Sequence, residues 1–315
     1  MKNTTLLSSV LAASFFLIGS NSYAQGISQV ESKQTSTSAS LIALTQYATV
    51  HNQKLGYRKF GQGTPLILIN RFRGTLDTWD PLFLDLLAKQ NTVIIFDQPG
   101  IGYSEGNLPL TMKELAAEVT GLADYLKIEK FNVMGWSYGG WVAQYVMFYN
   151  PSRVLKTILI DNNAMGKNAV PMEPAFAKSA MKANKDLGFE DYVTLFFEPK
   201  SESSRLAAQK SLERISKRID YSKVPENPEV LKRYFAPIQS IVDDAEHFRD
   251  AYATLKTPVL VMSGDHDISF SFDNWYPMIR KAPTTQFIVM PDAGHGPQDQ
   301  YPELASSYIN TFLKN

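Results

Sequence analysis

One short stretch of the sequence carries a serine in a setting suited to nucleophilic chemistry. Ser137 is the centre of the pentapeptide G-W-S-Y-G at 135–139, between an apolar run at 131–134 and a helical stretch at 141–149. A G-x-S-x-G pattern between a strand and a helix is a nucleophile elbow, whose tight turn lifts the serine hydroxyl above the sheet. Such a turn strains the backbone and requires small neighbours, which the glycines supply. The stretch predicts attack by Ser137 on a carbonyl carbon, with the N–H of Tyr138 stabilising the oxyanion.

The chain around this elbow alternates strands with helices. Strand-like apolar runs occur at 66–69, 92–96, 131–134, 154–160, 258–263 and 286–290. Helical patterns occur at 78–89, 111–126 and 303–313, and two short alternating segments at 47–50 and 55–60 are typical of an antiparallel edge pair. Thr111 and Glu114 have capping-box spacing at the start of one helix. The alternation predicts an α/β fold with a mostly parallel central sheet flanked by helices.

The alternation of strand-like and helical segments stops between residues 163 and 250. Strand-like runs are absent there, and helical segments with scattered aromatic residues take their place. This pattern predicts a helical cap inserted at 163–250, with the α/β core formed by 41–162 and 251–315. The aromatic residues fit the core of such an insertion, and they equally fit a lid that lines a pocket.

The N-terminus has the three parts of a secretory signal peptide. Lys2 precedes an apolar run at 6–18, and a small-residue pattern ends at Ala24. We therefore expect a signal peptide at 1–24 and export to the periplasm or the medium. The apolar run is too short to serve as a membrane anchor. The Ser-, Thr- and Gln-rich residues 25–40 are expected to form a flexible spacer.

Composition excludes several classes of function. The 315 residues include 31 basic and 31 acidic side chains, and loss of 1–24 would leave a net charge of −1. This balance gives no electrostatic case for binding nucleic acid or an anionic membrane. The chain has no cysteine, which excludes disulfides, a thiolate nucleophile, cysteine-based metal sites and an N-terminal lipid anchor.

Several motifs in order resemble the α/β-hydrolase superfamily, over roughly residues 46–314. They are the elbow, D-Q-P-G-I-G-Y-S at 97–104, G-D-H-D at 264–267, and G-H at 294–295. The family order of nucleophile, acid and base then falls on Ser137, Asp267 and His295. The imidazole would take the serine proton and the carboxylate would fix the imidazole tautomer. The resemblance implies a small-molecule acyl substrate and neither a metal nor an organic cofactor.

Alternatives to two triad members remain open from the sequence. His51, His247 and His266 are the other histidines, for which surface or structural roles are expected, and no pair has the spacing of a zinc site on a helix. Asp265 is an alternative acid, expected instead to cap its loop. Asp161, after the strand that follows the elbow helix, is the third candidate because some family members take the acid from there.

The predicted oxyanion loop departs from the family pattern. Asn70 and Arg71 stand where the family usually has His-Gly, and the N–H of Phe72 would be the donor. In one interpretation Asn70 makes the structural hydrogen bond that the histidine makes in the family, and the backbone of the loop is preserved. In the other, Arg71 and Arg73 narrow the site or pair with an anionic group of the substrate. Arg71, Arg73 and Trp136 are therefore the substrate-binding candidates.

The motifs together predict an exported serine hydrolase that cleaves a small carboxylic ester, lactone or related acyl compound. A serine nucleophile argues against epoxide hydrolases and haloalkane dehalogenases, which attack with a carboxylate. Acyl transfer, cofactor-free perhydrolysis and carbon–carbon hydrolysis would use the same triad. A ligand-binding protein with little or no turnover is the alternative outside catalysis, because the oxyanion loop is altered. The oligomeric state does not follow from the sequence.

Overall fold

The computed structural model describes residues 38–315. The predicted signal peptide at 1–24 lies outside these residues, as does the predicted spacer at 25–40 except for its last three residues. The first element is a short helix, α1 (Ala39–Ile42). Ser38 caps its N-terminus, and its side chain accepts a hydrogen bond from the N–H of Leu41. Over 38–315 none of the helices has the length and apolar character needed to cross a bilayer.

The centre of the structure is an eight-stranded sheet in the order β1-β2-β4-β3-β5-β6-β7-β8. Only the pairs β1·β2 and β2·β4 are antiparallel, and the remaining neighbours are parallel. The strands are β1 (Gln46–Val50), β2 (Gln53–Gly61), β3 (Thr64–Ile69), β4 (Asn91–Phe96), β5 (Phe131–Trp136), β6 (Val154–Ile160), β7 (Val259–Gly264) and β8 (Thr285–Met290). The sheet confirms the predicted α/β class, and its parallel part brings the carboxyl ends of β3, β5, β6, β7 and β8 to one edge.

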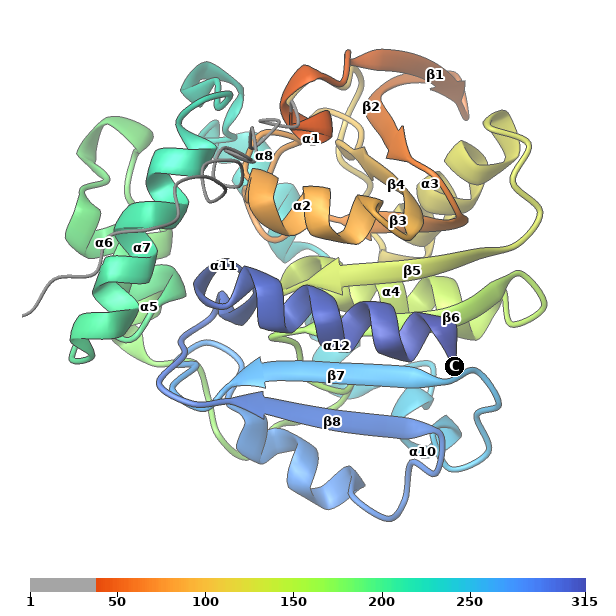
Figure 1. Cartoon of the computed structure of the whole chain (residues 1–315). Helices are drawn as coiled ribbons and strands as arrows, with labels where there is room; N and C mark the ends of the chain where they lie inside the picture. The colour runs from red at the N-terminus through yellow and green to blue at the C-terminus, as the bar shows by residue number, and fades with distance from the viewer. Residues whose placement is uncertain (1–37) are drawn as a thin grey trace, which may run out of the picture. The chain divides into compact units, whose positions relative to one another are not determined.

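Helices cover both faces of the sheet (Figure 1). On one face lie α3 (Met112–Tyr125) and α4 (Tyr138–Tyr149), and on the other lie α2 (Pro81–Ala88) and α12 (Pro302–Lys314). Each face has its own apolar cluster, because side chains alternate between the two faces along every strand. β3, for example, sends Ile67 and Ile69 into one cluster and Leu66 and Leu68 into the other.

The ends of the helices follow their capping residues. The capping box of Thr111 and Glu114 is present at the start of α3, as predicted. The helix predicted from residue 78 instead begins at Pro81. Asp80 caps it by accepting a hydrogen bond from the N–H of Leu82, and proline suits the first helical position because it has no N–H to satisfy. The elbow helix α4 begins at Tyr138, directly after the serine, and so three residues before the predicted start.

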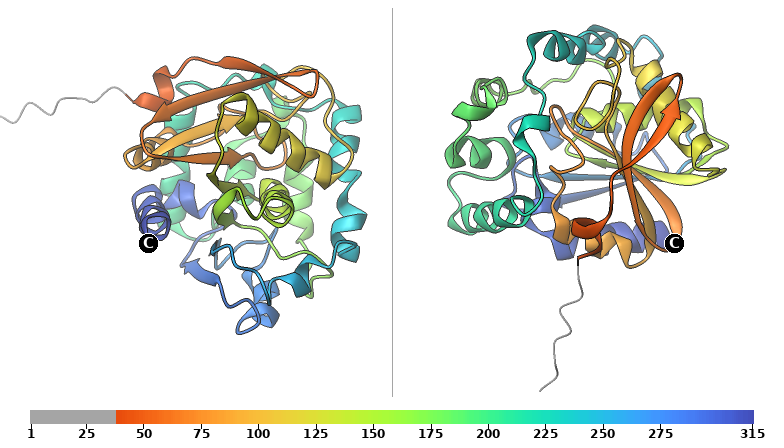
Figure 2. Two further views of the ribbon diagram at one scale, coloured as in Figure 1. Left: turned by 90° about the vertical axis from the view of Figure 1, so that its right-hand side faces the viewer. Right: turned by 90° about the horizontal axis from the view of Figure 1, so that it is seen from above.

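Six helices lie between β6 and β7, where the cap was predicted. They are α5 (Pro174–Ala180), α6 (Phe189–Phe196), α7 (Glu202–Ile215), α8 (Pro228–Phe235), α9 (Ile238–Asp243) and α10 (Phe248–Ala251). Figure 1 and the right-hand view of Figure 2 place α5, α6 and α7 at one end of the sheet. By contrast, α10 packs on the elbow helix, where the rings of Phe148 and Phe248 stack at 4.3 Å. The predicted cap segment 163–250 therefore divides between the end of the sheet and its face.

Candidate active site

The elbow holds Ser137 in a backbone conformation that serine rarely adopts. Its φ is 56° and its ψ is −122°, and its N–H donates to the carbonyl of Ile160 at 2.9 Å. Glycine is required around it for steric reasons. A Cβ on Gly135 would lie 2.1 Å from the carbonyl oxygen of Gly139, and a Cβ on Gly139 would lie 2.3 Å from that of Ile69. The turn therefore packs the start of α4 directly against β3 and β5.

The acid and base predicted from the motif order meet at the carboxyl edge of the sheet. Nδ1 of His295 and Oδ2 of Asp267 are 2.8 Å apart, and both residues are buried. Oδ1 of Asp267 accepts the N–H groups of Ser269 and Phe270 at 2.7 and 3.1 Å, so the carboxylate is held from both sides. Within residues 38–315, Nε2 of His295 is buried and has no hydrogen-bond partner. That nitrogen is therefore left to take the proton of Ser137, which lines the same cavity.

Aromatic side chains fix the imidazole. The ring of Phe270 stacks on His295 with centroids 5.5 Å apart, and Phe176 of α5 meets it edge-on at 5.1 Å. The indole Nε1 of Trp136 donates to the carbonyl of His295 at 2.7 Å. Trp136, a predicted substrate-binding residue, lines the cavity and also anchors the backbone of the base.

The two alternative acids occupy different places. Asp265 is exposed, contacts His266 at 2.7 Å and accepts the N–H of Ala293 at 3.2 Å, in keeping with loop capping. Asp161 is buried, accepts the N–H of Gly264 at 2.9 Å with Oδ1, and has no partner for Oδ2 within residues 38–315. Neither carboxylate is a hydrogen-bond partner of the His295 ring in the described chain, so the geometry favours the predicted Asp267.

Asp161 nevertheless belongs to the same buried cluster. Asp161, Asp267 and His295 each place a polar atom within 4.8 Å of the other two. Burial raises the pKa of Asp161 well above its usual value, and the charge of Asp267 raises it further.

Hydrogen bonds from Asn70 and Gly74 hold the predicted oxyanion loop. Asn70 Nδ2 donates to the carbonyl of Phe96 at 3.2 Å, and the N–H of Gly74 closes a turn onto the carbonyl of Arg71 at 2.9 Å. Among the backbone hydrogen bonds of turns and loops in the described chain, none has the N–H of Phe72 or Tyr138 as its donor. The two predicted oxyanion donors are therefore available to a substrate oxygen.

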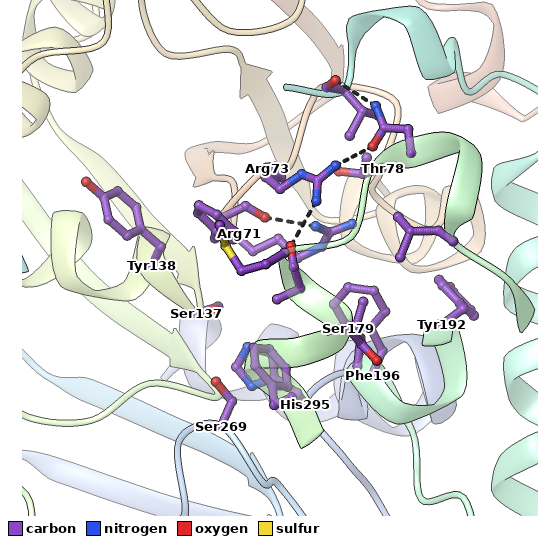
Figure 3. Close-up of a pocket in the computed structure, with 18 of the residues that line it drawn as sticks. Arg71, Arg73, Thr78, Ser137, Tyr138, Ser179, Tyr192, Phe196, Ser269 and His295 are labelled. Carbon is purple, nitrogen blue, oxygen red and sulfur yellow. Dashed lines mark hydrogen bonds between the residues drawn. The ribbon is translucent and has the colours of Figure 1, made fainter. Parts of the chain in front are cut away.

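The two arginines of this loop have different surroundings (Figure 3). Arg73 lines the cavity, but its guanidinium donates to the carbonyls of Ala180, Lys182 and Pro225 at 2.7–2.8 Å. Arg71 also lines the cavity, and its guanidinium carbon lies 4.4 Å from the ring centroid of Phe196. Arg73 is thus occupied by the inserted segment, whereas Arg71 faces the cavity. Of the two predicted substrate-binding arginines, the contacts favour Arg71 for that role.

Ser137 and His295 open into a cavity of about 860 Å³ between the sheet edge and the inserted helices. Its wall is mostly aromatic and aliphatic, and includes Phe176, Tyr192, Leu195, Phe196, Tyr234 and Phe235. The ring of Phe72 packs edge-on against Tyr234 of α8, with centroids 4.9 Å apart. A cavity of this size and character suits a small, largely apolar ligand with few polar groups.

The sequence patterns missed two acidic residues of the cavity wall, Glu226 and Asp299, of which Asp299 is deeply buried. Asp299 lines the cavity, is only 1% exposed, and has no hydrogen-bond partner for Oδ1 within residues 38–315. Burial raises its pKa well above the usual value, and the charge of Asp80 adds to the effect. Asp299 is four residues after His295, in a polar stretch without strand or helix periodicity. Nothing in that stretch marks the carboxyl group as buried.

Comparison with known proteins identifies the family. The model of the alpha/beta hydrolase fold matches residues 64–302. An acetyltransferase component of the acetoin cleaving system of Pseudomonas putida is 30% identical over 80% of this chain, and the chain spans 64% of that protein's length. A 2-hydroxy-6-oxo-6-phenylhexa-2,4-dienoate hydrolase of Burkholderia cepacia is 23% identical, with 89% of this chain and 98% of that protein covered.

Solved structures agree on the architecture. An alpha/beta hydrolase fold protein of Chitinophaga pinensis has a TM-score of 0.79 and 29% identity, with 88% of this chain and 99% of that chain covered. A thermophilic esterase of Thermogutta terrifontis has a TM-score of 0.67 and 24% identity, with 86% of this chain and 98% of that chain covered, a likeness of fold. With the elbow and the Asp267–His295 pair in place, the chain belongs to the alpha/beta hydrolase fold family.

Proposed function

We propose that this protein is a serine hydrolase that cleaves a small carboxylic ester, lactone or related acyl compound. The observation that carries the proposal is the 2.8 Å contact between His295 and Asp267, which leaves Nε2 of the imidazole without a partner in residues 38–315, in the cavity that Ser137 lines. The cavity of about 860 Å³ supports a small substrate rather than a polymer.

The reaction would proceed through an acyl-enzyme. Ser137 Oγ attacks the acyl carbon as its proton passes to Nε2 of His295, and the N–H groups of Phe72 and Tyr138 hold the oxyanion. The tetrahedral intermediate collapses, the bond to the leaving oxygen breaks, and His295 returns the proton to the alcohol. Water then attacks the ester on Ser137 with His295 again as base, which releases the acid and restores the serine. Asp267 offsets the imidazolium charge in both halves.

The inserted helices support a role as a cap. Helices α5, α6 and α8 contribute Phe176, Phe196 and Tyr234 to the cavity wall, and Phe176 also touches the ring of His295. Such walls exclude water from the acyl group during attack, which strengthens the electrostatic contribution of the oxyanion donors. We therefore assign the cap function to α5–α8, to which α9 adds Ile238 at the cavity wall, while α10 packs on α4.

The proposal is tested with a chain-length series of p-nitrophenyl esters, measured as burst and steady-state rates. Turnover should peak at one acyl length and disappear in Ser137→Ala. Labelling of Ser137 by a fluorophosphonate, followed by mass spectrometry of the modified peptide, checks the nucleophile independently. Folded wild-type protein that neither turns over any ester nor takes the label would refute the proposal and favour a ligand-binding role.

Transfer of the acyl group to an acceptor other than water is a second candidate. The acetyltransferase name of the Pseudomonas putida relative favours it, although the chain spans only 64% of that protein. Both reactions share the acyl-enzyme, so competition separates them. Added alcohols, hydroxylamine or hydrogen peroxide should divert product from the acid in a saturable manner if the enzyme binds an acceptor. A product ratio that follows only the chemical reactivity of the acceptor would leave hydrolysis as the function.

We further propose that the protein is exported. The charged residue, apolar run and small-residue pattern at 1–24 support the proposal. Cell fractionation and sequencing of the mature N-terminus test it, with Gln25 as the expected first residue. An intact N-terminus on protein found in the cytoplasm would contradict export.

A further inference from the structure

The guanidinium of Arg71 lies against aromatic rings in the cavity and forms no ion pair within residues 38–315. Its carbon is 5.2 Å from the ring centroid of Trp136 and 4.4 Å from that of Phe196. By contrast, Arg58, Arg205 and Arg214 each have a carboxylate at 2.5–2.6 Å. One nitrogen of Arg71 donates to the carbonyl of Phe72 at 2.9 Å, and Nε is buried without a partner in the described chain. Most of the N–H donors of the Arg71 guanidinium therefore have no acceptor in the described chain.

In the described chain none of the ion pairs includes Arg71, although the charge of Asp299 raises the pKa of its guanidinium. The carboxylate of Asp80 is bound by Nε of Arg214 at 2.8 and 2.9 Å and by Oγ of Ser211 at 2.8 Å. Burial raises the pKa of Asp299 well above its usual value, and the charges of Arg71 and Arg214 oppose that shift. Burial lowers the pKa of Arg71 only to about 10, so the guanidinium remains protonated at neutral pH. An unmatched cation in an apolar cavity is costly to bury, and an anionic ligand would remove that cost.

We propose that Arg71 is the receptor for a carboxylate on the substrate, so that the enzyme prefers acyl compounds that carry a free carboxylate beside the carbonyl under attack. This inference rests on the proposed function of Ser137. The planar fork of a guanidinium matches a carboxylate with two parallel hydrogen bonds. Phe72, the next residue, supplies an oxyanion N–H. The same loop would therefore bind the oxygen of the reacting carbonyl through Phe72 and the carboxylate through Arg71.

The charge of Arg71 and its position in the cavity narrow the kind of anion that it would bind. The one charge of Arg71 suits a singly charged carboxylate better than a doubly charged phosphate, which would leave one charge unpaired at this guanidinium. The view of Figure 3 draws Arg71 between Arg73 and the pair of Ser137 and His295. A dicarboxylic half-ester with a short aliphatic spacer meets both requirements.

The test uses two p-nitrophenyl esters that differ only in charge. One is the mono-p-nitrophenyl ester of glutaric acid, and the other is its methyl ester at the distal carboxyl. Wild type should show a higher kcat/KM for the charged ester. Arg71→Met should lower the ratio of the two kcat/KM values by roughly 10–100-fold, the range expected for a charge-assisted hydrogen-bond pair. Arg71→Lys should retain part of the ratio, because it keeps the charge and loses the fork.

A matched control removes an arginine outside the cavity. Arg205 is on α7 and pairs with Glu190, and Arg205→Met should leave the ratio of the two esters as in wild type. Equal kcat/KM values for both esters in wild type would overturn the carboxylate receptor while leaving the hydrolase intact. An equal loss on both esters in Arg71→Met would also overturn it, because it would show a purely structural role.

A binding measurement tests the carboxylate receptor independently of the proposed hydrolase activity. Monomethyl glutarate and dimethyl glutarate are titrated calorimetrically into Ser137→Ala, which has no nucleophile to consume them. Preferential binding of the monoanion, lost when Arg71→Met is added to the same protein, supports the receptor even if no ester is turned over. Absence of that preference overturns it, whatever the hydrolysis assays show.

Discussion

Arg73 donates a hydrogen bond from Nη1 to the carbonyl oxygen of Ala180 at 2.8 Å, and this contact joins the oxyanion loop to helix α5. The same guanidinium also reaches the carbonyls of Lys182 and Pro225. The backbone of Arg73 has a φ of 57°, so the loop bends sharply there. Since Phe72 is the preceding residue, the position of its N–H is tied to the position of the inserted helices.

Loss of the Arg73 side chain should make both the oxyanion loop and the inserted helices less well fixed. We expect Arg73→Gln to lower kcat/KM by about tenfold or more, because a charged donor bonded to three carbonyls is worth several kcal/mol. Limited proteolysis should also cleave the region around residues 180–226 faster than in wild type. Arg205→Gln is the control for loss of a cap arginine. Wild-type rates of turnover and cleavage in Arg73→Gln would contradict this assignment.

The buried acids should differ sharply in their effect on catalysis. Asp267→Asn should reduce kcat by about 10⁴, since an amide cannot hold the required imidazole tautomer or offset its charge. Asp161→Asn should cost less than about tenfold, because a neutral amide resembles the neutral carboxyl favoured there. Steady-state kinetics with a p-nitrophenyl ester compares the two variants. A larger loss in Asp161→Asn would reassign the catalytic acid.

The elbow glycine at 135 should tolerate no side chain. In Gly135→Ala the new Cβ would meet the carbonyl oxygen of Gly139 at 2.1 Å, a backbone atom that cannot move without distorting the turn. We expect a loss of roughly 3 kcal/mol or more of unfolding free energy, at the upper end of overpacking effects, together with lost activity. Gly188→Ala is the control, because the atom nearest its added Cβ is 3.9 Å away. Equal denaturation midpoints of the two variants would be inconsistent with the crowded turn.

Asp97 should make the stability of the protein depend on pH. Burial raises its pKa to about 7, although the N–H groups of Leu76 and Tyr103 each donate to it at 2.8 Å. In the unfolded chain an aspartate has a pKa of about 3.9. Between about pH 4 and 7 the folded protein therefore binds a proton that the unfolded chain has lost, and the free energy of unfolding from this group falls as pH rises.

Urea unfolding of wild type and Asp97→Asn from pH 4.5 to 8 measures this effect. Because the amide does not titrate, the wild type should lose stability relative to the variant as pH rises to about 7, and the difference should level off above that. A difference that is constant across the range would show that Asp97 keeps an ordinary pKa in the folded protein.

The sequence by itself determined the features that depend on short-range geometry. The elbow at 135–139 is encoded by glycines that a side chain would obstruct, and the start of α3 by the capping box of Thr111 and Glu114. The alternation of apolar runs with helical patterns was sufficient to predict a mostly parallel sheet. The order of elbow, acid motif and base motif predicted the pair of Asp267 and His295, which the structure places in contact.

The tertiary structure decided which side chains share the edge of the sheet. Asp161, Asp265 and Asp267 all follow strands, and only the packing of the loops after β6, β7 and β8 shows which carboxylate bonds to His295. Arg71 and Arg73 are two residues apart and equally basic in the sequence. One meets carbonyls of the inserted segment and the other faces the cavity, because contacts between segments about 100 residues apart are set by packing and leave no local signal.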